Sequence, residues 1–357
     1  MFSLTFSTAR AWSGRGLQSR QFQRFSSRFN SADFAFAFDI DGVLLRGSKA
    51  FDEAKKALQF LENNKVPWIL LTNGGGKTEA KRVSDLSSSL GLDISTSQFI
   101  QSHTPFRRLA DTYTKILVVG GDGDTCRSVA ESYGFADCAM SIDVIAADPH
   151  TWPFHRYTPD ALANLARPLS ASKFDAVLVF NDPRDWGCEV QVVTDVLTSR
   201  DGVLGTKTDD LVQTMPIYFS NNDLLWANEH KFARFGQGAF RSSLEKVFED
   251  YTARKLRSVI IGKPFIFTYE YAHKVLDEFR ASRYGYAGHV KRVYMVGDNP
   301  ASDIRGGNDY GWHSILVRTG VYKDGDVIPQ GSVPKAIVEN VYEAVMHAVE
   351  NEAASRH

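Results

Sequence analysis

The chain has 357 residues, of which 43% are hydrophobic and 23% charged, a composition typical of a globular protein with about two domains. The formal net charge of -1 gives no reason to expect nucleic acid or an anionic membrane surface as a partner. The sequence has no apolar run of the roughly 18 residues that a transmembrane helix requires, so we expect no such helix.

Residues 1–30 contain five arginines, many serines and phenylalanines, and neither aspartate nor glutamate. This composition is typical of a mitochondrial transit peptide. Phe2, Leu4, Phe6 and Trp12 would form the apolar face of its helix. A disordered basic tail and a chloroplast transit peptide are the alternatives. We therefore expect residues 1–30 to be a disordered transit peptide and the protein to work in mitochondria, with the matrix as the expected compartment.

From residue 34 onward, short apolar runs alternate with helical patterns, which predicts a parallel α/β architecture. Two helices are predicted, at Glu53–Asn63 and at Glu79–Leu90 with Thr78 as its N-cap. The predicted strands are Phe34–Phe38, Trp68–Leu71, Ile116–Val119, Ala176–Phe180, Ile217–Ser220, Val259–Ile261, Val293–Val296 and Ser314–Val317.

Two loop segments are candidate hinges, His103-Thr104-Pro105 and Phe235-Gly236-Gln237-Gly238. They divide the chain after the transit peptide into a first core part at residues 31–103, an inserted α/β domain at 104–235 and a second core part at 236–357. The three cysteines (Cys126, Cys138 and Cys188) lack metal-type spacing, and their odd number does not suit a disulfide framework, so we expect buried thiols.

The sharpest chemical signal is the pair Asp39 and Asp41, which follows the strand Phe34–Phe38. A spacing of two residues aims both carboxylates to one side, and ligands of open α/β sheets bind beyond the carboxyl ends of the strands. Gly42 then permits a sharp turn. Mg²⁺ prefers such oxygen ligands and leaves room for a phosphate.

Three more predicted strands end in suitable side chains. Thr72, Asn73 and the glycines that follow can hold phosphate oxygens, and Lys263 can neutralise phosphate charge. Asp298 and Asp303 add carboxylates for a metal ion. Each motif alone is more often a turn or a solvated loop. Together, however, the four motifs each place phosphate-binding or metal-binding side chains at the end of an apolar strand, which favours a functional site.

These four motifs, in this order, resemble those of the haloacid dehalogenase (HAD) superfamily from Phe34 to about Glu339. The long insert resembles its large α/β cap, so the resemblance implies a doubly wound, Rossmann-like core with an inserted cap domain. Three cap segments (Asn181–Gly187, Ser220–Trp226 and Arg234–Phe240), together with Ser102–Phe106, resemble the cat eye syndrome critical region protein branch. That branch is largely mitochondrial and is associated with glycerophospholipid metabolism.

The resemblance implies a role for each matching residue. Asp39 would be the nucleophile that becomes aspartyl-phosphate, and Asp41 would protonate the leaving oxygen and then activate water. Thr72 would bind the transferring phosphoryl group, and Lys263 would counter its charge. Mg²⁺ would be held by Asp39, the backbone carbonyl of Asp41, Asp298 and Asp303, the last directly or through a water.

The candidate substrate-binding residues are Asn73, Gly74, Asn222, Asp223 and Arg234. Trp186 and Trp226 are further candidates, although aromatic residues of a cap more often belong to its core. His103 is interpreted as a hinge residue rather than a catalyst, since the four motifs already supply acid, base and nucleophile.

The sequence thus predicts a Mg²⁺-dependent phosphohydrolase that acts on a small organic phosphate, with a link to glycerophospholipid metabolism through the resemblance. A phosphomutase and a non-catalytic binding protein on the same fold are the alternatives. Dehalogenases lack an acid at the offset of Asp41, and transport ATPases carry threonine there, so Asp41 favours phosphatase or phosphomutase chemistry. The resemblance also implies a homodimer formed through the cap, and no nucleic-acid partner is expected.

Overall fold

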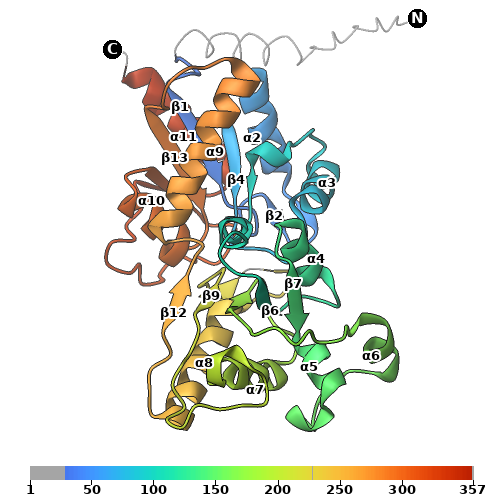
Figure 1. The fold of residues 1–357 in the computed structure, drawn as a ribbon. Helices are drawn as coiled ribbons and strands as arrows, with labels where there is room; N and C mark the ends of the chain where they lie inside the picture. Colours follow the sequence, from blue (N-terminus) through green and yellow to red (C-terminus); the bar gives the residue numbers. More distant parts are fainter. Residues whose placement is uncertain (1–28, 227, 356–357) are drawn as a thin grey trace, which may run out of the picture.

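The computed structural model describes residues 29–226 and 228–355 (Figure 1). Most of the expected transit peptide, residues 1–28, lies outside this range. Phe29 is buried, and its ring packs edge-on against Phe34 with the centroids 5.6 Å apart. Phe29 is therefore part of the folded core, and the expected disordered segment does not extend to residue 30.

A six-stranded parallel sheet forms the first unit of the molecule, at the top of Figure 1. The central strand β1 (Phe34–Phe38) pairs with β13 (Arg292–Gly297) on one side and β4 (Trp68–Leu71) on the other. The outer strands are β5 (Phe99–Ile100), β14 (His313–Val317) and β15 (Ala336–Val338). The order β15-β14-β13-β1-β4-β5 thus unites strands from both ends of the chain.

Helices cover both faces of this sheet, and alternate side chains of β1 pack against the helices on opposite faces. Phe34, Phe36 and Phe38 point to the face covered by α2 (Asp52–Asn63), α3 (Glu79–Leu90) and α11 (Val341–Ala354). The small residues Ala35 and Ala37 point to the other face, where α9 (Ile266–Tyr284) packs. Because both faces are covered, every residue of β1 is buried, as expected for a central parallel strand.

A five-stranded parallel sheet, of order β12-β9-β8-β6-β7, forms the second unit below the first (Figure 1). Its strands are β6 (Lys115–Val119), β7 (Asp137–Met140), β8 (Ala176–Val179), β9 (Ile217–Phe219) and β12 (Ser258–Ile260). The helices of this unit are α4 (Thr125–Ser132), α5 (Ser141–Ala147), α6 (Pro159–Leu165), α7 (Trp186–Leu197) and α8 (Gln237–Thr252). Helices α5, α7 and α8 contribute to the core on one face, and α4 and α6 to the core on the other.

The second unit extends beyond residue 235, where the sequence analysis placed its end. Phe240, Leu244 and Phe248 of α8 pack into the core of the second sheet. Strand β12 pairs in parallel with β9 of that sheet, and Figure 1 shows it in the lower unit. The chain therefore returns to the first unit only after β12, because α8 and β12 bury their apolar side chains against the second sheet.

The eight predicted strands and the two predicted helices all form, within one or two residues of their expected ends. The alternating α/β fold with two units is therefore confirmed. Thr78 caps α3, since its Oγ1 accepts from Lys81 N at 3.3 Å. The three cysteines are buried and free of disulfides, as expected. Within the described ranges, no helix combines the length and apolarity needed to cross a membrane.

The sequence analysis did not predict several short elements. The hairpin β2 (Leu45–Arg46) with β3 (Lys49–Ala50) follows the Asp39 motif. A second hairpin, β10 (Leu225–Trp226) with β11 (Arg234–Phe235), projects from the second unit. Strands of two residues carry too little alternation to be recognised from a sequence. The remaining short helices are η1 (Thr96–Gln98), η2 (Thr104–Leu109), η3 (Pro149–Thr151), η4 (Arg200–Gly202), η5 (Pro300–Ile304) and α10 (Arg305–Asp309).

Candidate active site

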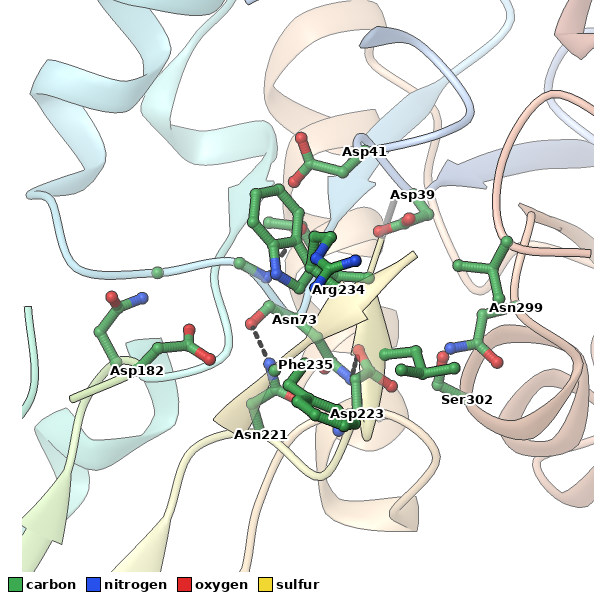
Figure 2. A pocket seen from close by; sticks show the side chains of 18 of the residues that line it. Asp39, Asp41, Asn73, Asp182, Asn221, Asp223, Arg234, Phe235, Asn299 and Ser302 are labelled. Carbon is green, nitrogen blue, oxygen red and sulfur yellow. Dashed lines mark hydrogen bonds between the residues drawn. The ribbon is translucent and has the colours of Figure 1, made fainter. Parts of the chain in front are cut away.

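A cavity of about 660 Å³ lies where the carboxyl ends of the first sheet face the second unit. Figure 2 shows how side chains from both units point into it. The first unit contributes most of the residues that the sequence analysis singled out, namely Asp39, Asp41, Thr72, Asn73, Gly74, Lys263, Asp298 and Asp303. These residues are widely separated in the sequence, and they line one cavity, as expected.

Lys263 lies at the centre of the charged groups in this cavity. Its Nζ donates to Asp39 Oδ1 at 2.7 Å and to Asp303 Oδ1 at 2.6 Å, and all three residues are buried. Burial by itself disfavours the ammonium form, but the charges of Asp303 and Asp39 outweigh it and raise the pKa of Lys263. Lys263 is therefore a fixed positive charge beside Asp39.

Three carboxylates converge next to this lysine. Asp39, Asp298 and Asp303 each offer one oxygen, and these oxygens lie within 4.8 Å of one another. Burial raises the pKa of Asp39 even though Lys263 opposes the shift, and burial with the charges of Asp39 and Asp303 raises the pKa of Asp298 well above its usual range. Burial also raises the pKa of Asp303 to about 6. The ammonium of Lys263 can therefore balance the charge of only one of these three carboxylates.

Backbone groups fix the cluster in place. Asp298 Oδ2 accepts from Val321 N at 2.6 Å, and Asp303 Oδ2 accepts from Asn299 N at 3.0 Å. Gly42 makes the turn after Asp41 with φ of 90°. A Cβ at Gly42 would collide with the Asp298 carboxylate, so the turn and the close approach both require glycine.

Asp41 lies apart from the three converging carboxylates. Its side chain is 24% exposed, and Asp41 Oδ1 lies 3.8 Å from an Nη atom of Arg82 on α3. Burial raises the pKa of Asp41, although Arg82 and Lys263 oppose the shift. The carboxylate of Asp41 does not belong to the cluster, and the sequence analysis had assigned its backbone carbonyl rather than this side chain to the metal.

The loop after β4 links the two units. Asn73 Nδ2 donates to Asp223 Oδ2 at 2.9 Å, and Asn221 Nδ2 donates back to the Asn73 carbonyl at 3.0 Å. The Asn73 side chain also binds both the N–H and the carbonyl of Lys263. Thr72 Oγ1 accepts from Gly74 N at 2.9 Å. The second unit is therefore hydrogen-bonded directly to residues beside Asp39.

The candidates from the second unit divide into those that line the cavity and one that does not. Asp223 and Arg234 line it, and Figure 2 shows both pointing inward. Asn222 is not among the lining residues, which corrects its expected place there. Asn221 lines the cavity instead, because its side-chain amide donates to the Asn73 carbonyl. The Asn222 carbonyl packs against Gly238 at the start of α8.

The two tryptophans and His103 differ in their environments. Trp186 packs edge-on against Phe240 in the second core and also borders the cavity, whereas Trp226 is 40% exposed at the cavity. His103 is fully buried outside it. There, His103 Nε2 accepts from Gly76 N at 3.1 Å, and Nδ1 lies 2.8 Å from the Tyr133 hydroxyl. Burial lowers the pKa of His103 to about 4, so this ring is neutral and its position is structural.

Several lining residues were missed by the sequence analysis. They include Arg82 on α3, Asn221 after β9, and Glu229, which reaches the first unit by accepting from Ser48 N at 3.3 Å. A charged residue on a helix face carries no signal of its own before the helix is placed. Asn221 lies in the segment Ser220–Trp226, which was singled out for its resemblance, but the sequence does not tell which of Asn221 and Asn222 lines the cavity.

Comparison with known proteins gives a consistent result. The haloacid dehalogenase-like hydrolase family matches residues 36–136, and a HAD-hydrolase-like family matches residues 260–344. Mitochondrial hydrolase YKR070W of Saccharomyces cerevisiae is 43% identical over 345 residues, which cover 90% of this chain and 97% of that protein.

Two further proteins are similar over most of the chain. A cardiolipin synthase (CMP-forming)/mitochondrial hydrolase fusion protein of Schizosaccharomyces pombe is 42% identical over 95% of this chain, which spans only 58% of that protein. A crystal structure of a possible sugar phosphatase from Cytophaga hutchinsonii superimposes with a TM-score of 0.62, at 17% identity, over 90% of this chain and 97% of that structure. At this identity the superposition shows the fold alone.

Proposed function

Because the chain belongs to the haloacid dehalogenase-like hydrolases, we propose that it is a Mg²⁺-dependent phosphomonoester hydrolase with Asp39 as its nucleophile. The observation that carries this proposal is the convergence of Asp39, Asp298 and Asp303 within 4.8 Å, with Lys263 Nζ 2.7 Å from Asp39. This arrangement combines a nucleophile, a cation site and a counter-charge at one end of a cavity.

The three converging carboxylates suit a hard divalent cation. They offer oxygen donors, which Mg²⁺ prefers, and their pKa values are raised by burial first and then by the negative charge of neighbouring carboxylates. Asp39 and Asp298 would hold the ion, and Asp303 would support it directly or through water. When bound, Mg²⁺ would offset charge on the phosphoryl oxygens and keep Asp39 ionised.

The reaction proceeds in two displacements. In the first, an oxygen of Asp39 attacks phosphorus, the bond from phosphorus to the ester oxygen breaks, and Asp41 gives its proton to the departing alkoxide. In the second, Asp41 takes a proton from water, the water oxygen attacks phosphorus, and the bond to Asp39 breaks to release phosphate. The raised pKa of Asp41 supports its proton-bearing role in the first displacement.

Neighbouring groups would stabilise the charge that develops on the phosphoryl oxygens. The Lys263 ammonium is already fixed by two carboxylates, so little reorganisation is needed during the reaction. Thr72, Asn73 and Gly74 line the same cavity as Asp39, Asp298 and Asp303. We propose that they bind the transferring group.

The second unit would select the organic part of the substrate. Arg234, Asp223 and Trp226 face the cavity from that unit, so a small organic phosphate with both polar and apolar parts fits this lining. The fission-yeast relative joins a mitochondrial hydrolase to a cardiolipin synthase. This fusion supports a glycerophospholipid-related substrate and a mitochondrial location for this chain, and we propose the matrix as the compartment. The homodimer through the second unit stays a prediction.

The proposal is tested by hydrolysis of p-nitrophenyl phosphate with Mg²⁺, using the wild type and Asp39→Asn. The variant should lose at least ~10³-fold in kcat/KM, because a nucleophile has no substitute in this mechanism. Its circular dichroism spectrum and melting temperature should show a folded protein. Asp93→Asn, an exposed aspartate outside the cavity, is the matched control and should retain activity. Undiminished turnover by Asp39→Asn would remove Asp39 from the mechanism.

A further inference from the structure

A second cavity, of about 430 Å³, opens at the other end of the first sheet. The residues around it precede or begin three neighbouring strands: Arg292 begins β13, His313 begins β14, and Lys335 comes directly before β15. His273 of α9 closes one side. Asp298 of the candidate active site comes directly after the carboxyl end of β13, so β13 separates the two cavities along its length.

The side chains around this cavity carry charge of one sign. Its ionisable residues are basic, apart from a tyrosine, and none of the residues that the structure places around it is acidic (His273, Lys291, Arg292, Tyr310, His313 and Lys335). Lys291 pairs with Asp33 at 3.0 Å and Arg292 with Glu352 at 2.7 Å, outside the lining. Within the described ranges, Lys335 has no ion-pair partner, so its charge remains available to a ligand.

The charges around His313 act on its pKa. Burial lowers the pKa of His313, and the positive charges of Arg292, His347 and Lys335 lower it further, although Glu352 opposes the shift. His313 also packs against Tyr294 with the ring centroids 5.0 Å apart. Of the lysines and arginines around the cavity, Lys335 is the one without an ion-pair partner in the described ranges, and its charge favours an anion.

The cavity also holds polar atoms that lack a partner. Trp312 is 5% exposed, and its indole Nε1 has no hydrogen-bond acceptor in the described structure. His273 Nδ1 is buried without a partner in the same region, and its ring lies 6.1 Å from that of Trp312. A buried N–H without an acceptor costs about 1–3 kcal/mol, so such a group in a native protein calls for an explanation.

We propose that this second cavity binds a small phosphate-bearing anion. A phosphate group would accept a hydrogen bond from Trp312 Nε1, which has no acceptor. It would also supply an ion-pair partner for Lys335. The volume lies within the usual range of roughly 300–1,000 Å³ for small-molecule sites and exceeds what a bare phosphate ion fills. Tyr310, Trp312 and His273 form an aromatic wall against which the organic part of a phosphate ester can pack.

This site is independent of the proposed catalytic site, because it lies at the opposite end of β13 and uses none of the same residues. Both cavities nevertheless contact the same two elements. Strand β13 runs from Arg292 to Gly297, directly before Asp298, and α9 carries His273 and begins three residues after Lys263. A ligand in the second cavity would therefore contact elements that also position the catalytic cluster.

The test is calorimetric titration of the full chain with inorganic phosphate and with AMP, in excess chelator. Without a divalent cation, the acidic cluster of the first cavity repels these anions. The wild type should bind one equivalent, and the comparison of the two ligands shows whether the bare ion or the organic ester is preferred. Lys335→Glu should weaken binding roughly tenfold through the loss and reversal of a charge, and Trp312→Phe about fivefold through the loss of one donor.

Lys255→Glu is the matched control, because Lys255 is an exposed lysine in the second unit and lines neither cavity. It should bind both ligands as the wild type does. Melting temperatures of the three variants show that they are folded. Absence of saturable binding by the wild type, or equal affinities in the wild type, Lys335→Glu and Trp312→Phe, would overturn the proposal.

Discussion

Lys263 Nζ lies 2.7 Å from Asp39 Oδ1, although 224 residues separate the two in sequence. Lys263 belongs to the connection between β12 of the second sheet and α9 of the first unit. Asp39 comes directly after β1, the central strand of the first sheet. The contact therefore joins the central strand to the segment through which the chain returns from the second unit.

Removal of this ammonium should destabilise the protein more than removal of an exposed lysine. In Lys263→Met, the buried carboxylates of Asp39, Asp298 and Asp303 lose their only nearby cation among the described residues, at a cost of about 3–5 kcal/mol. Thermal and urea unfolding without divalent ions measure this loss, with the exposed Lys49→Met as the control. An unchanged melting temperature would contradict the role of Lys263 as counter-charge.

Mg²⁺ should stabilise the wild type, because an ion that binds only the folded state raises the free energy of unfolding by about 2.7 kcal/mol at one hundred times its Kd. Asp298→Asn should lose this stabilisation. Without metal, the same variant should be more stable than the wild type, since it removes one of three crowded carboxylates.

These opposite shifts are measured as melting temperatures with Mg²⁺ and with chelator. Asp309→Asn, an aspartate of α10 that lines neither cavity, should respond to Mg²⁺ as the wild type does. A metal-dependent rise in the melting temperature of Asp298→Asn as large as that of the wild type would contradict the assigned cation site.

The hydrogen bond between Asp223 and Asn73 should matter for catalysis more than for stability. In Asp223→Ala, Asn73 keeps its bonds to Lys263 and its carbonyl still accepts from Asn221, but its side chain loses the bond to the second unit. We expect kcat/KM to fall roughly tenfold, with a stability loss of about 1 kcal/mol. Kinetics with p-nitrophenyl phosphate and urea unfolding measure both, and the exposed Asp209→Ala serves as the control. Wild-type kinetics in Asp223→Ala would show that this link plays no part in turnover.

Glu189, on α7, should make stability depend on pH. Burial raises its pKa from 4.5 to about 7, although Ser141 Oγ donates to it at 2.5 Å. Between these two values the folded protein binds a proton that the unfolded chain does not, so stability falls as pH rises through this window. Glu189→Gln cannot ionise and should therefore exceed the wild type by on the order of 3 kcal/mol at pH 8.

The measurement is a series of melting temperatures from pH 4.5 to 8. The difference between Glu189→Gln and the wild type should grow up to about pH 7 and then level off. The exposed Glu249→Gln should follow the wild-type curve. A constant difference across the series would show that Glu189 does not hold a proton in the folded protein.

The sequence allowed prediction of the catalytic side of the site because strand ends of a parallel sheet meet at one edge. Asp39 and Asp298 follow neighbouring strands of the first sheet, and that rule alone brings them together. Lys263 follows β12 of the second sheet, so its approach to Asp39 depends on how the two units pack. The second unit was harder to predict. Phe235-Gly236-Gln237-Gly238 has the composition of a hinge, but the helical pattern of α8 does not reveal which sheet it covers, so the boundary was placed too early.

Side chains that act from other elements could not be predicted in the same way. Arg82 approaches Asp41 from a helix, and its position depends on how α3 packs. Trp226 and Arg234 belong to a hairpin of two-residue strands that is held against the cavity by tertiary contacts. The basic cavity beside Lys335 gathers residues from four separate segments, and the strand-end rule does not apply at the amino ends of strands.

The pairing of β1 with β13 constrains the order in which the newly synthesised chain acquires structure. Phe34 lies opposite Arg292, so this side of the central strand waits for some 260 later residues to leave the ribosome or a translocation pore, whereas β4 can pair with the other side earlier. The second sheet is contiguous between residues 115 and 260 and forms in the meantime. Until then β1 presents the rings of Phe34, Phe36 and Phe38 without the cover of α11, so we expect a product truncated before α11 to expose this apolar face and to aggregate.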